Sequence, residues 1–116
     1  MMRKSLAVFF LMMLTLPASA GLLPLHGDQI VKLLSDKTLY AKVDGKAASQ
    51  LFQKSGATFY SVGDAQNQGA WKIDGDKYCS VWPPNETWVC YDVLQDDKTV
   101  TFVSPSGKQS VFSTMQ

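Results

Sequence analysis

The sequence predicts a mainly β fold, an antiparallel meander of about eight short strands forming a small barrel or curved sheet, with one short N-terminal helix. Three observations support this fold class. The spacing of apolar residues changes from a helical period to alternation near Lys37. Beyond Lys37, turn signals recur about every ten residues. The connections are too short for crossover helices, so neighbouring strands pair as hairpins, and barrel closure would remove exposed strand edges.

Residues 1–20 have the pattern of a secretory signal peptide. A positively charged start precedes an apolar run from Leu6–Leu16, and Ala18-Ser19-Ala20 forms an A-x-A cleavage signal. The run is shorter than the roughly 20 apolar residues that a membrane-spanning helix needs. We therefore expect cleavage near Ala20, a periplasmic or secreted location, and a single small β domain at residues 21–116.

The charge of the chain changes when this segment is removed. The full sequence of 116 residues has 11 basic and 10 acidic side chains. Because Arg3 and Lys4 lie in the segment, the remaining 96 residues have nine basic and ten acidic side chains, a net charge of −1. No basic excess is left for nucleic acid. The expected partner is an envelope protein or a small apolar ligand, and we expect a monomer with no membrane span in the mature chain.

A short helix is expected after an irregular lead-in at residues 21–26. Asp28 stands at the N-cap position before residues 29–35. A helix of about two turns is too short to be stable alone, so it must dock on the sheet by its apolar side, where it would cover one end or face. That side is formed by Ile30, Leu33 and Leu34.

The strands are expected at residues 39–43, 49–54, 57–62, 70–73, 77–82, 87–93, 99–103 and 109–112. Strong turn signals, Asp44-Gly45 and Ser55-Gly56, follow the first two. Residues 47–54 also contain good helix formers, but the hairpin turn after them favours a strand. Residues 63–69 are expected to form a polar loop. The remaining turns are expected at residues 74–76, 83–86, 95–98 and 104–107.

The two cysteines flank one predicted hairpin. If the chain folds symmetrically about Pro84-Asn85, Cys79 faces Cys90, as Tyr78 faces Tyr91 and Ser80 faces Val89. An exported chain with an even cysteine count predicts a disulfide between them, worth roughly 3 kcal/mol for a loop of about 12 residues. A redox or metal site is the weaker alternative, since the spacing is not C-x-x-C.

The sequence contains little that indicates catalysis. The one histidine, His26, lies in the lead-in, so a Ser-His-Asp arrangement would place its base on a flexible arm. Asp74 and Asp76 could bind calcium or act as acid and base, but the EF-hand spacing is not met. The turn residues Asp44, Asp96 and Asp97 are typical of turn hydrogen bonding. We expect no catalytic residue, no metal site, no cofactor and no enzymatic activity.

Aromatic residues are the better candidates for a binding surface. The five candidates are Trp71, Tyr78, Trp82, Trp88 and Tyr91. Strand alternation places Tyr78, Ser80 and Trp82 on one face of the hairpin and Trp88 with the cysteines on the other. Core packing is the favoured interpretation, because aromatic side chains dominate small cores. The alternative is an exposed binding surface around Trp82-Pro83-Pro84.

Residues 69–79, followed by Cys90-Tyr91, resemble small exported proteobacterial proteins grouped as domain-of-unknown-function family 995. A G-x-W strand, a Gly-Asp turn and a cysteine hairpin carry the resemblance, together with residues 100–102 and 106–108. Residues 33–39 resemble the opening segment of the family, with Asp36 where glycine is expected. The resemblance implies an envelope protein of unassigned activity, and it transfers no catalytic residue.

Residues 55–60 are also similar to the SG-x-x-Y segment of C-type lysozyme inhibitors, which are small disulfide-linked β-barrels. Phe59 stands where the inhibitors have tyrosine, and the cysteine arrangement differs. The sequence thus predicts a non-enzymatic binding or envelope-accessory module. The alternative is an inhibitor of an exported hydrolase such as lysozyme, acting through Ser55-Gly56 or the tip at residues 82–86. A third hypothesis is a small hydrolase that uses turn carboxylates.

Overall fold

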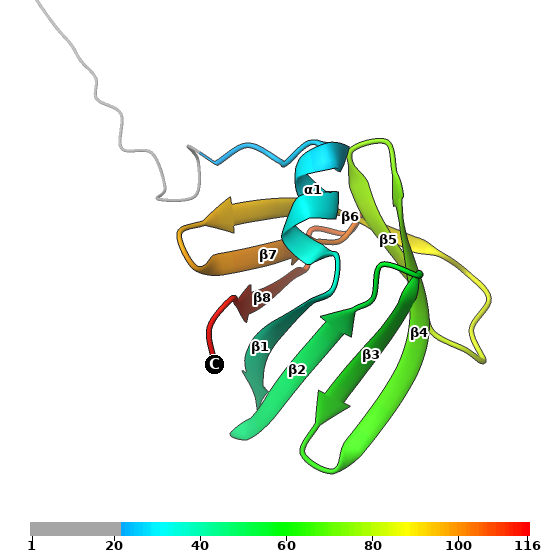
Figure 1. Ribbon diagram of the computed structural model, residues 1–116, viewed down its shortest axis with the longest axis vertical. Helices are drawn as coiled ribbons and strands as arrows, with labels where there is room; N and C mark the ends of the chain where they lie inside the picture. Colours follow the sequence, from blue (N-terminus) through cyan, green and yellow to red (C-terminus); the bar gives the residue numbers. More distant parts are fainter. Residues whose placement is uncertain (1–21) are drawn as a thin grey trace, which may run out of the picture.

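The computed structural model describes residues 22–116, which form a closed barrel of eight antiparallel strands with one short helix (Figure 1). The predicted signal peptide lies outside the described residues. Within them, no helix has the length and apolarity that crossing a membrane requires. The elements are α1 (Gly27–Leu34), β1 (Lys37–Val43), β2 (Lys46–Phe52), β3 (Ala57–Val62), β4 (Ala65–Asp74), β5 (Lys77–Val81), β6 (Val89–Asp96), β7 (Thr99–Val103) and β8 (Gln109–Ser113).

The strands follow the predicted meander. Each strand pairs with the next in the sequence, and β8 returns to β1, where Tyr40 pairs with Ser113. The sheet is therefore closed into a barrel. Residues 46–52 form a strand, so the helical alternative for this segment is wrong.

The polar loop predicted at residues 63–69 is wrong. Only Gly63-Asp64 turns, and β4 begins at Ala65 and continues for ten residues. The first four residues of β4 are exposed although they pair with β3. Strand alternation is visible in a sequence only where one face of a strand is buried, which is why this end of the hairpin gave no such signal.

The strand predicted at residues 87–93 is also shifted. It begins at Val89 and extends to Asp96, so Trp88 lies in the connection before it. The turn that follows consists of Asp97-Lys98 alone, with Asp97 at a φ of 54°. Because aspartate tolerates this left-handed conformation better than most residues, a tight turn is possible where a longer one was expected.

The helix begins two residues earlier than predicted, and its N-cap is His26 instead of Asp28. Its first turn is held by two side-chain acceptors. Gln29 Oε1 accepts from the His26 N–H at 2.8 Å, and Asp76 Oδ1 accepts from the Gly27 N–H at 2.8 Å. The second acceptor is 49 residues away in the sequence, so local sequence patterns could not indicate it.

Gly27 allows the helix to approach the turn between β4 and β5. A Cβ atom at this position would collide with the carbonyl oxygen of Gly75. The close approach places Ile30 and Leu34 in the end of the barrel, where both side chains are fully buried. The helix therefore covers one end of the barrel, as predicted.

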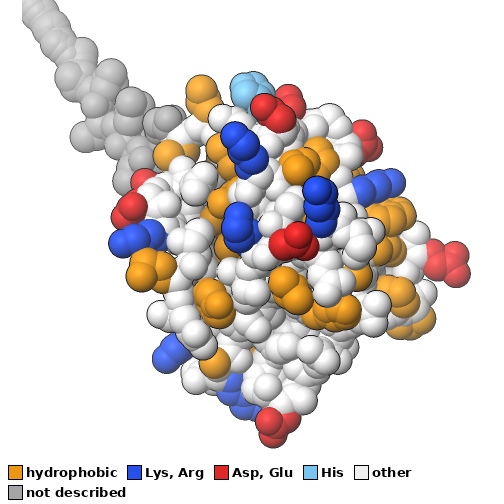
Figure 2. Space-filling model, viewed as in Figure 1, with side chains coloured by type: hydrophobic (Ala, Val, Ile, Leu, Met, Phe, Trp, Pro, Cys, Tyr) orange, Lys and Arg blue, Asp and Glu red, His pale blue; other side chains and the backbone are white. Residues whose placement is uncertain are grey.

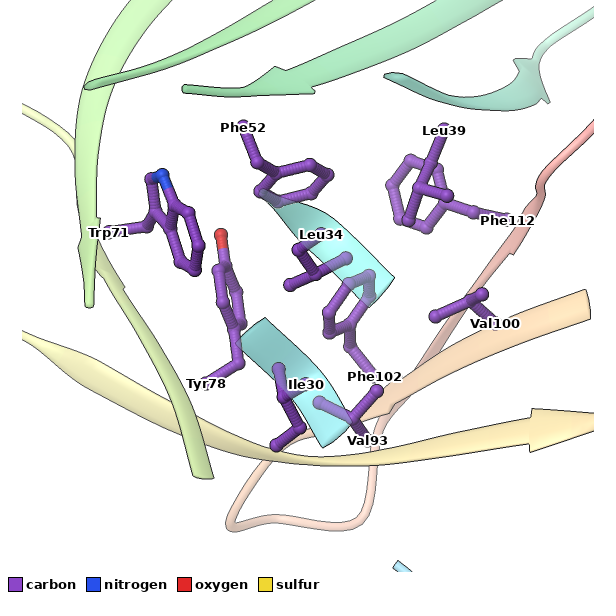
Figure 3. Packing of buried hydrophobic residues seen from close by; sticks show 10 residues of the cluster. All are labelled: Ile30, Leu34, Leu39, Phe52, Trp71, Tyr78, Val93, Val100, Phe102 and Phe112. Atoms are coloured by element: carbon purple, nitrogen blue, oxygen red, sulfur yellow. The ribbon is translucent and has the colours of Figure 1, made fainter. Parts of the chain in front are cut away.

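The core lies between this helix and the inner face of the strands (Figure 3). Its members are Ile30, Leu34, Leu39, Phe52, Trp71, Tyr78, Val93, Val100, Phe102 and Phe112. Phe52 is central, since its ring makes edge contacts with Trp71 at 5.8 Å and Tyr78 at 5.7 Å between centroids. Half of these ten residues are aromatic, as is common in small cores.

The disulfide has the predicted partners and the predicted register. Cys79 and Cys90 are bonded and directly opposite each other, with Tyr78 facing Tyr91 and Ser80 facing Val89. The ladder between β5 and β6 has only these three residue pairs. The covalent bond therefore joins the barrel wall at one of its shortest ladders.

Candidate functional site

A cavity of about 390 Å³ lies toward the end of the barrel opposite the helix. The chain enters β1 from the helix, so the last residues of β1 and the first residues of β8 mark the far end. Both strand ends line the cavity. The lining residues are Ala41, Lys42, Val43, Gln50, Tyr60, Tyr78, Ser80, Trp82, Tyr91, Phe102, Ser110, Val111 and Phe112.

Three neutral polar side chains form the inner part of this cavity. Gln50, Tyr78 and Ser80 are 6%, 4% and 3% exposed. Gln50 Nε2 donates to the Thr58 Oγ1 at 3.0 Å and to the Tyr78 hydroxyl at 3.2 Å, and Trp82 Nε1 donates to Ser80 Oγ at 3.3 Å. We call Gln50, Tyr78 and Ser80 the polar floor.

Burial changes the pKa of Tyr78, the one titratable residue of the polar floor. It raises the pKa of the Tyr78 hydroxyl to about 12, and hydrogen bonds with Ser80 and Gln50 only partly oppose this rise. Desolvation disfavours the phenolate, because a charge in this setting loses its hydration. Tyr78 therefore keeps its proton at neutral pH and can donate a hydrogen bond.

Aromatic rings form the walls above the polar floor. Tyr60 and Trp82 meet edge to face, with 6.3 Å between centroids and 71° between planes. Phe102 packs against Tyr78 at 4.9 Å and against Tyr91 at 6.3 Å. Such walls favour an apolar or aromatic guest, which gains contact with both ring faces and ring edges.

The cavity also opens through the barrel wall between β1 and β8. Their ladder contains one residue pair, Tyr40 with Ser113. Continuing this register would place Lys42 opposite Val111, but the two strands do not pair there. Lys42 and Val111 are exposed residues, and both nevertheless line the cavity. We call this parting of β1 and β8 the seam.

The five aromatic residues proposed from the sequence do not form one surface. Trp71 and Tyr78 are core residues, as the favoured interpretation predicts. Trp82 and Tyr91 are half-buried and line the cavity with Tyr78. Trp88 is 38% exposed and does not line the cavity; the Lys72 ammonium lies 4.3 Å from its ring centroid.

Sequence reasoning missed most of the cavity. The missed residues that matter most are Gln50, Tyr60, Phe102 and Phe112. One signal was available for Gln50, which alternates in β2 with two buried apolar residues, Ala48 and Phe52. A polar residue at a strand position facing the core is a candidate for an internal hydrogen-bonding role.

The charged residues near the helix have structural partners. His26, expected on a flexible arm, caps α1, and its Nδ1 lies 3.6 Å from Asp76 Oδ2. Lys77 Nζ lies 2.6 Å from Asp92 Oδ1. The hydrogen bond from the Gly27 N–H is the main cause that lowers the pKa of Asp76. The contacts of His26 and Gly27 with Asp76 attach the lead-in and helix to the barrel, whereas the pair of Lys77 and Asp92 joins β5 to β6.

One trio of potential metal ligands occurs within residues 22–116. The ligand atoms of Asp74, Cys79 and Cys90 lie within 4.8 Å of one another. The two sulfur atoms are bonded to each other, so neither is available as a thiolate ligand. The three ligand atoms lie close together because the disulfide joins two of them and the exposed carboxylate of Asp74 lies beside it.

The connection between β5 and β6 projects from the barrel (Figure 1). Residues 83–88 are exposed, and the Asn85 N–H donates to the Trp82 carbonyl at 3.0 Å. Figure 2 shows hydrophobic side chains gathered on the side of the molecule from which this connection projects. By contrast, the blue lysine side chains are scattered across the same view.

Comparisons with protein families, with curated proteins and with solved structures found no match for this chain. The resemblances based on short motifs therefore stay predictions. Function follows from the chemistry of the cavity and of the projecting connection.

Proposed function

We propose that this protein is a non-enzymatic binding module that holds a small, largely apolar ligand in the open end of its barrel. The observation that carries the proposal is the cavity of about 390 Å³ with aromatic walls and a polar floor. Ligand sites in proteins are commonly clefts of about 300–1,000 Å³ with many apolar contacts and few polar ones. Barrels of about eight strands are wide enough for one small ligand.

The side chains of the cavity support binding and offer little for catalysis. Within residues 22–116, Ser80 is the only buried aliphatic hydroxyl in the lining. Its hydrogen-bond partners are the donor Trp82 Nε1 and the Tyr78 hydroxyl, which keeps its proton at neutral pH. A serine nucleophile needs a neighbouring base, which an indole N–H does not supply. Among the described residues of the lining, none has a carboxylate or an imidazole that could act as that base.

A fluorescent probe tests the site directly. N-phenyl-1-naphthylamine is neutral and fluoresces when it enters an apolar site, so the wild-type protein should enhance its emission at saturating one-to-one stoichiometry. Ser110→Phe places a ring at the cavity lining and should abolish most of the enhancement. Gln109→Phe adds the same ring at the neighbouring position, which does not line the cavity, and should leave the enhancement unchanged.

The control decides the interpretation of this titration. Equal enhancement by Ser110→Phe and Gln109→Phe would mean that the probe binds elsewhere, and no enhancement by the wild type would mean that the cavity is filled by its own side chains. Either result overturns the proposed function. Far-ultraviolet circular dichroism should show that both variants keep the β fold.

We further propose that the module acts in the periplasm or outside the cell. The apolar segment with its A-x-A signal supports this location, and the disulfide is of a kind that persists in oxidising compartments. Expression of the full chain in a Gram-negative host should yield a mature protein that begins at Gly21. N-terminal sequencing of the periplasmic fraction checks this, and an uncleaved chain in the cytoplasm would contradict it.

A second candidate function, inhibition of an exported hydrolase, is favoured by the projecting connection at residues 82–88. The disulfide lies near its base, and Trp88 is exposed on it. The other proposed inhibitory segment, Ser55-Gly56, is a tight turn held against the barrel, since the Trp71 N–H donates to the Gly56 carbonyl at 2.9 Å. A protein inhibitor commonly presents a preorganised loop of the first kind.

Activity assays with a C-type lysozyme distinguish this function from ligand binding. An inhibitor should lower lysozyme activity in proportion to its concentration, and Trp88→Ala should weaken the inhibition at least tenfold. Ser110→Phe should inhibit as well as the wild type, because it alters the cavity alone. Unchanged lysozyme activity at a large excess of the protein would exclude lysozyme as the target.

A further inference from the structure

The amide of Gln50 has a fixed orientation. Thr58 Oγ1 donates its hydrogen to the Leu51 carbonyl at 2.8 Å, so toward Gln50 it can only accept. Gln50 Nε2 must therefore face Thr58, and it also reaches the Tyr78 hydroxyl. This orientation turns the oxygen of the amide away from both partners.

Gln50 Oε1 consequently receives no hydrogen bond from the described part of the chain. No group within residues 22–116 donates a hydrogen bond to it, although the side chain is only 6% exposed and lines the cavity. A buried acceptor without a partner is costly, so it is normally satisfied by another group. The unused acceptor thus points to a ligand that brings a donor.

The same floor also offers a donor. The Tyr78 hydroxyl accepts from Gln50 and the Ser80 hydroxyl accepts from Trp82. These two neighbouring hydroxyls carry two hydrogens, and at most one of the two can form a hydrogen bond from one hydroxyl to the other. One hydrogen remains for a ligand atom. A ligand group that both donates and accepts, such as a hydroxyl or an amide, can satisfy Gln50 and the hydroxyl pair together.

The charge of the lining restricts the ligand further. Among the described residues that line the cavity, Lys42 is the only charged one, and it is exposed at the seam. An anionic group at the polar floor would have no cation beside it, and burying an unpaired charge is strongly unfavourable. The group that reaches the floor should therefore be neutral.

The walls favour a flat ring over a sugar or an alkyl chain. A sugar has hydroxyls around its whole ring, and the walls formed by Trp82 and Phe102 would leave most of them without partners. A saturated chain fills space but lacks the ring quadrupole that edge-to-face and offset contacts require. The edge-to-face pair of Tyr60 and Trp82 shows the contact geometry that a planar guest can continue.

We infer that the cavity binds a neutral aromatic ring compound that carries a hydroxyl or amide group, with this group donating to Gln50 Oε1 and accepting from the Tyr78 and Ser80 hydroxyl pair. This inference rests on the proposed function, because it names the ligand class of the same cavity. It makes Gln50 the residue that determines specificity.

Four probes with the same two-ring carbon skeleton test each part of the inference. 2-Naphthol has the ring and the donor, 2-methoxynaphthalene lacks the donor, 2-naphthoate is anionic, and decahydro-2-naphthol has the donor on a saturated ring. Displacement of N-phenyl-1-naphthylamine measures the affinity of each. 2-Naphthol should bind about tenfold more tightly than 2-methoxynaphthalene, the effect of one buried hydrogen bond, and more tightly than the other two probes.

Gln50→Met removes the acceptor while keeping the side-chain volume. It should bring 2-naphthol and 2-methoxynaphthalene to equal affinity without abolishing the binding of N-phenyl-1-naphthylamine. Gln68→Met is the matched control, because Gln68 is exposed on β4 and does not line the cavity. It should keep the tenfold preference for 2-naphthol. Circular dichroism confirms that both variants are folded.

The outcomes separate the two proposals. If the wild type binds all four naphthalene probes equally, or prefers 2-naphthoate, the inferred ligand class is wrong while the cavity remains a ligand site. A preference for 2-naphthol that survives in Gln50→Met likewise overturns the role of Gln50. If the wild type binds neither N-phenyl-1-naphthylamine nor any of the four probes, the proposed function itself fails and the inference fails with it.

Discussion

Asp36 shows how one side chain supports an unfavourable backbone conformation. It connects α1 to β1 with a φ of 60°, a left-handed conformation that glycine adopts most easily. Its carboxylate oxygen Oδ1 accepts from the Lys54 N–H at 2.8 Å, which ties the connection to the turn after β2. This hydrogen bond opposes the conformational cost of a residue with a Cβ atom at this position.

Substitutions of Asp36 should separate the contribution of its hydrogen bond from the cost of its left-handed backbone conformation. Asp36→Ala loses the hydrogen bond and keeps the strain, so it should lower the free energy of unfolding by about 1–2 kcal/mol. Asp36→Gly loses the hydrogen bond but removes the strain, so its loss should be smaller by roughly 1 kcal/mol. Urea unfolding measures both, and an alanine variant as stable as the glycine variant would contradict this account.

Tyr78 should make the stability of the barrel sensitive to alkaline pH. Its pKa rises from 10.0 to about 12 on folding, so the folded state holds the proton more tightly than the unfolded state. The resulting stability is complete below pH 10 and is lost as the pH rises toward 12, by up to about 3 kcal/mol.

Tyr78→Phe should remove this pH-dependent loss. Unfolding free energies measured from pH 8 to pH 11.5 should fall more steeply for the wild type than for the variant. At pH 8 the variant itself should be about 1 kcal/mol less stable, because Gln50 Nε2 loses one acceptor. Parallel curves for the two proteins would show that the phenol is not the group responsible.

At the scale of elements, the hairpin of β5 and β6 combines a short ladder with a covalent bond. The three-pair ladder is reinforced by the Cys79–Cys90 disulfide. Cys79→Ser together with Cys90→Ser should lower the free energy of unfolding by about 2–5 kcal/mol. Chemical denaturation measures the loss, and the wild type with a reducing agent should show a loss of similar size. A change near zero would mean that the disulfide contributes no stability.

The same hairpin shows what sequence patterns predict well. Its register could be counted outward from Pro84-Asn85, because the chain folds back symmetrically about these residues and residues equally far from them face each other. The helix start and the first half of β4 could not be predicted in this way. One acceptor at the helix start, Asp76, comes from another element and leaves no local signal, whereas the other, Gln29, is local. Residues 65–68 are exposed, so the first half of β4 has no alternation to indicate it.

At the scale of the whole molecule, the seam should be the least protected part of the wall. β1 and β8 share one residue pair, whereas β1 and β2 share seven. Residues 109–111 pair with β7 alone, whereas the centre of β2 pairs with strands on both sides. The amide hydrogens at 109–111 should therefore exchange faster on average than those in the centre of β2, measured by hydrogen exchange with mass spectrometry or nuclear magnetic resonance. Equal protection in both segments would show that β1 and β8 are hydrogen-bonded along their whole length.

The candidate site is a property of the closed barrel, which explains why only part of it could be predicted. Tyr78, Trp82 and Tyr91 lie on one hairpin, and alternation correctly placed the first two on the same face. Gln50 and Phe102 join them from β2 and β7 only when the strands curve into a ring. Residues that meet through closure leave no spacing pattern in a single sequence.

The seam also has a consequence for the order in which the chain folds. Seven of the eight strand pairings join sequence neighbours, and these can form early because little chain entropy is lost in closing a short turn. The pairing of Tyr40 with Ser113 spans nearly the whole sheet, from β1 to β8. Closing so long a loop costs chain entropy, and a single residue pair offsets this cost. We expect the hairpins to form first and the pairing of β1 with β8 at the seam to form last. The transition state for folding should therefore contain the hairpins but not the pairing that closes the barrel.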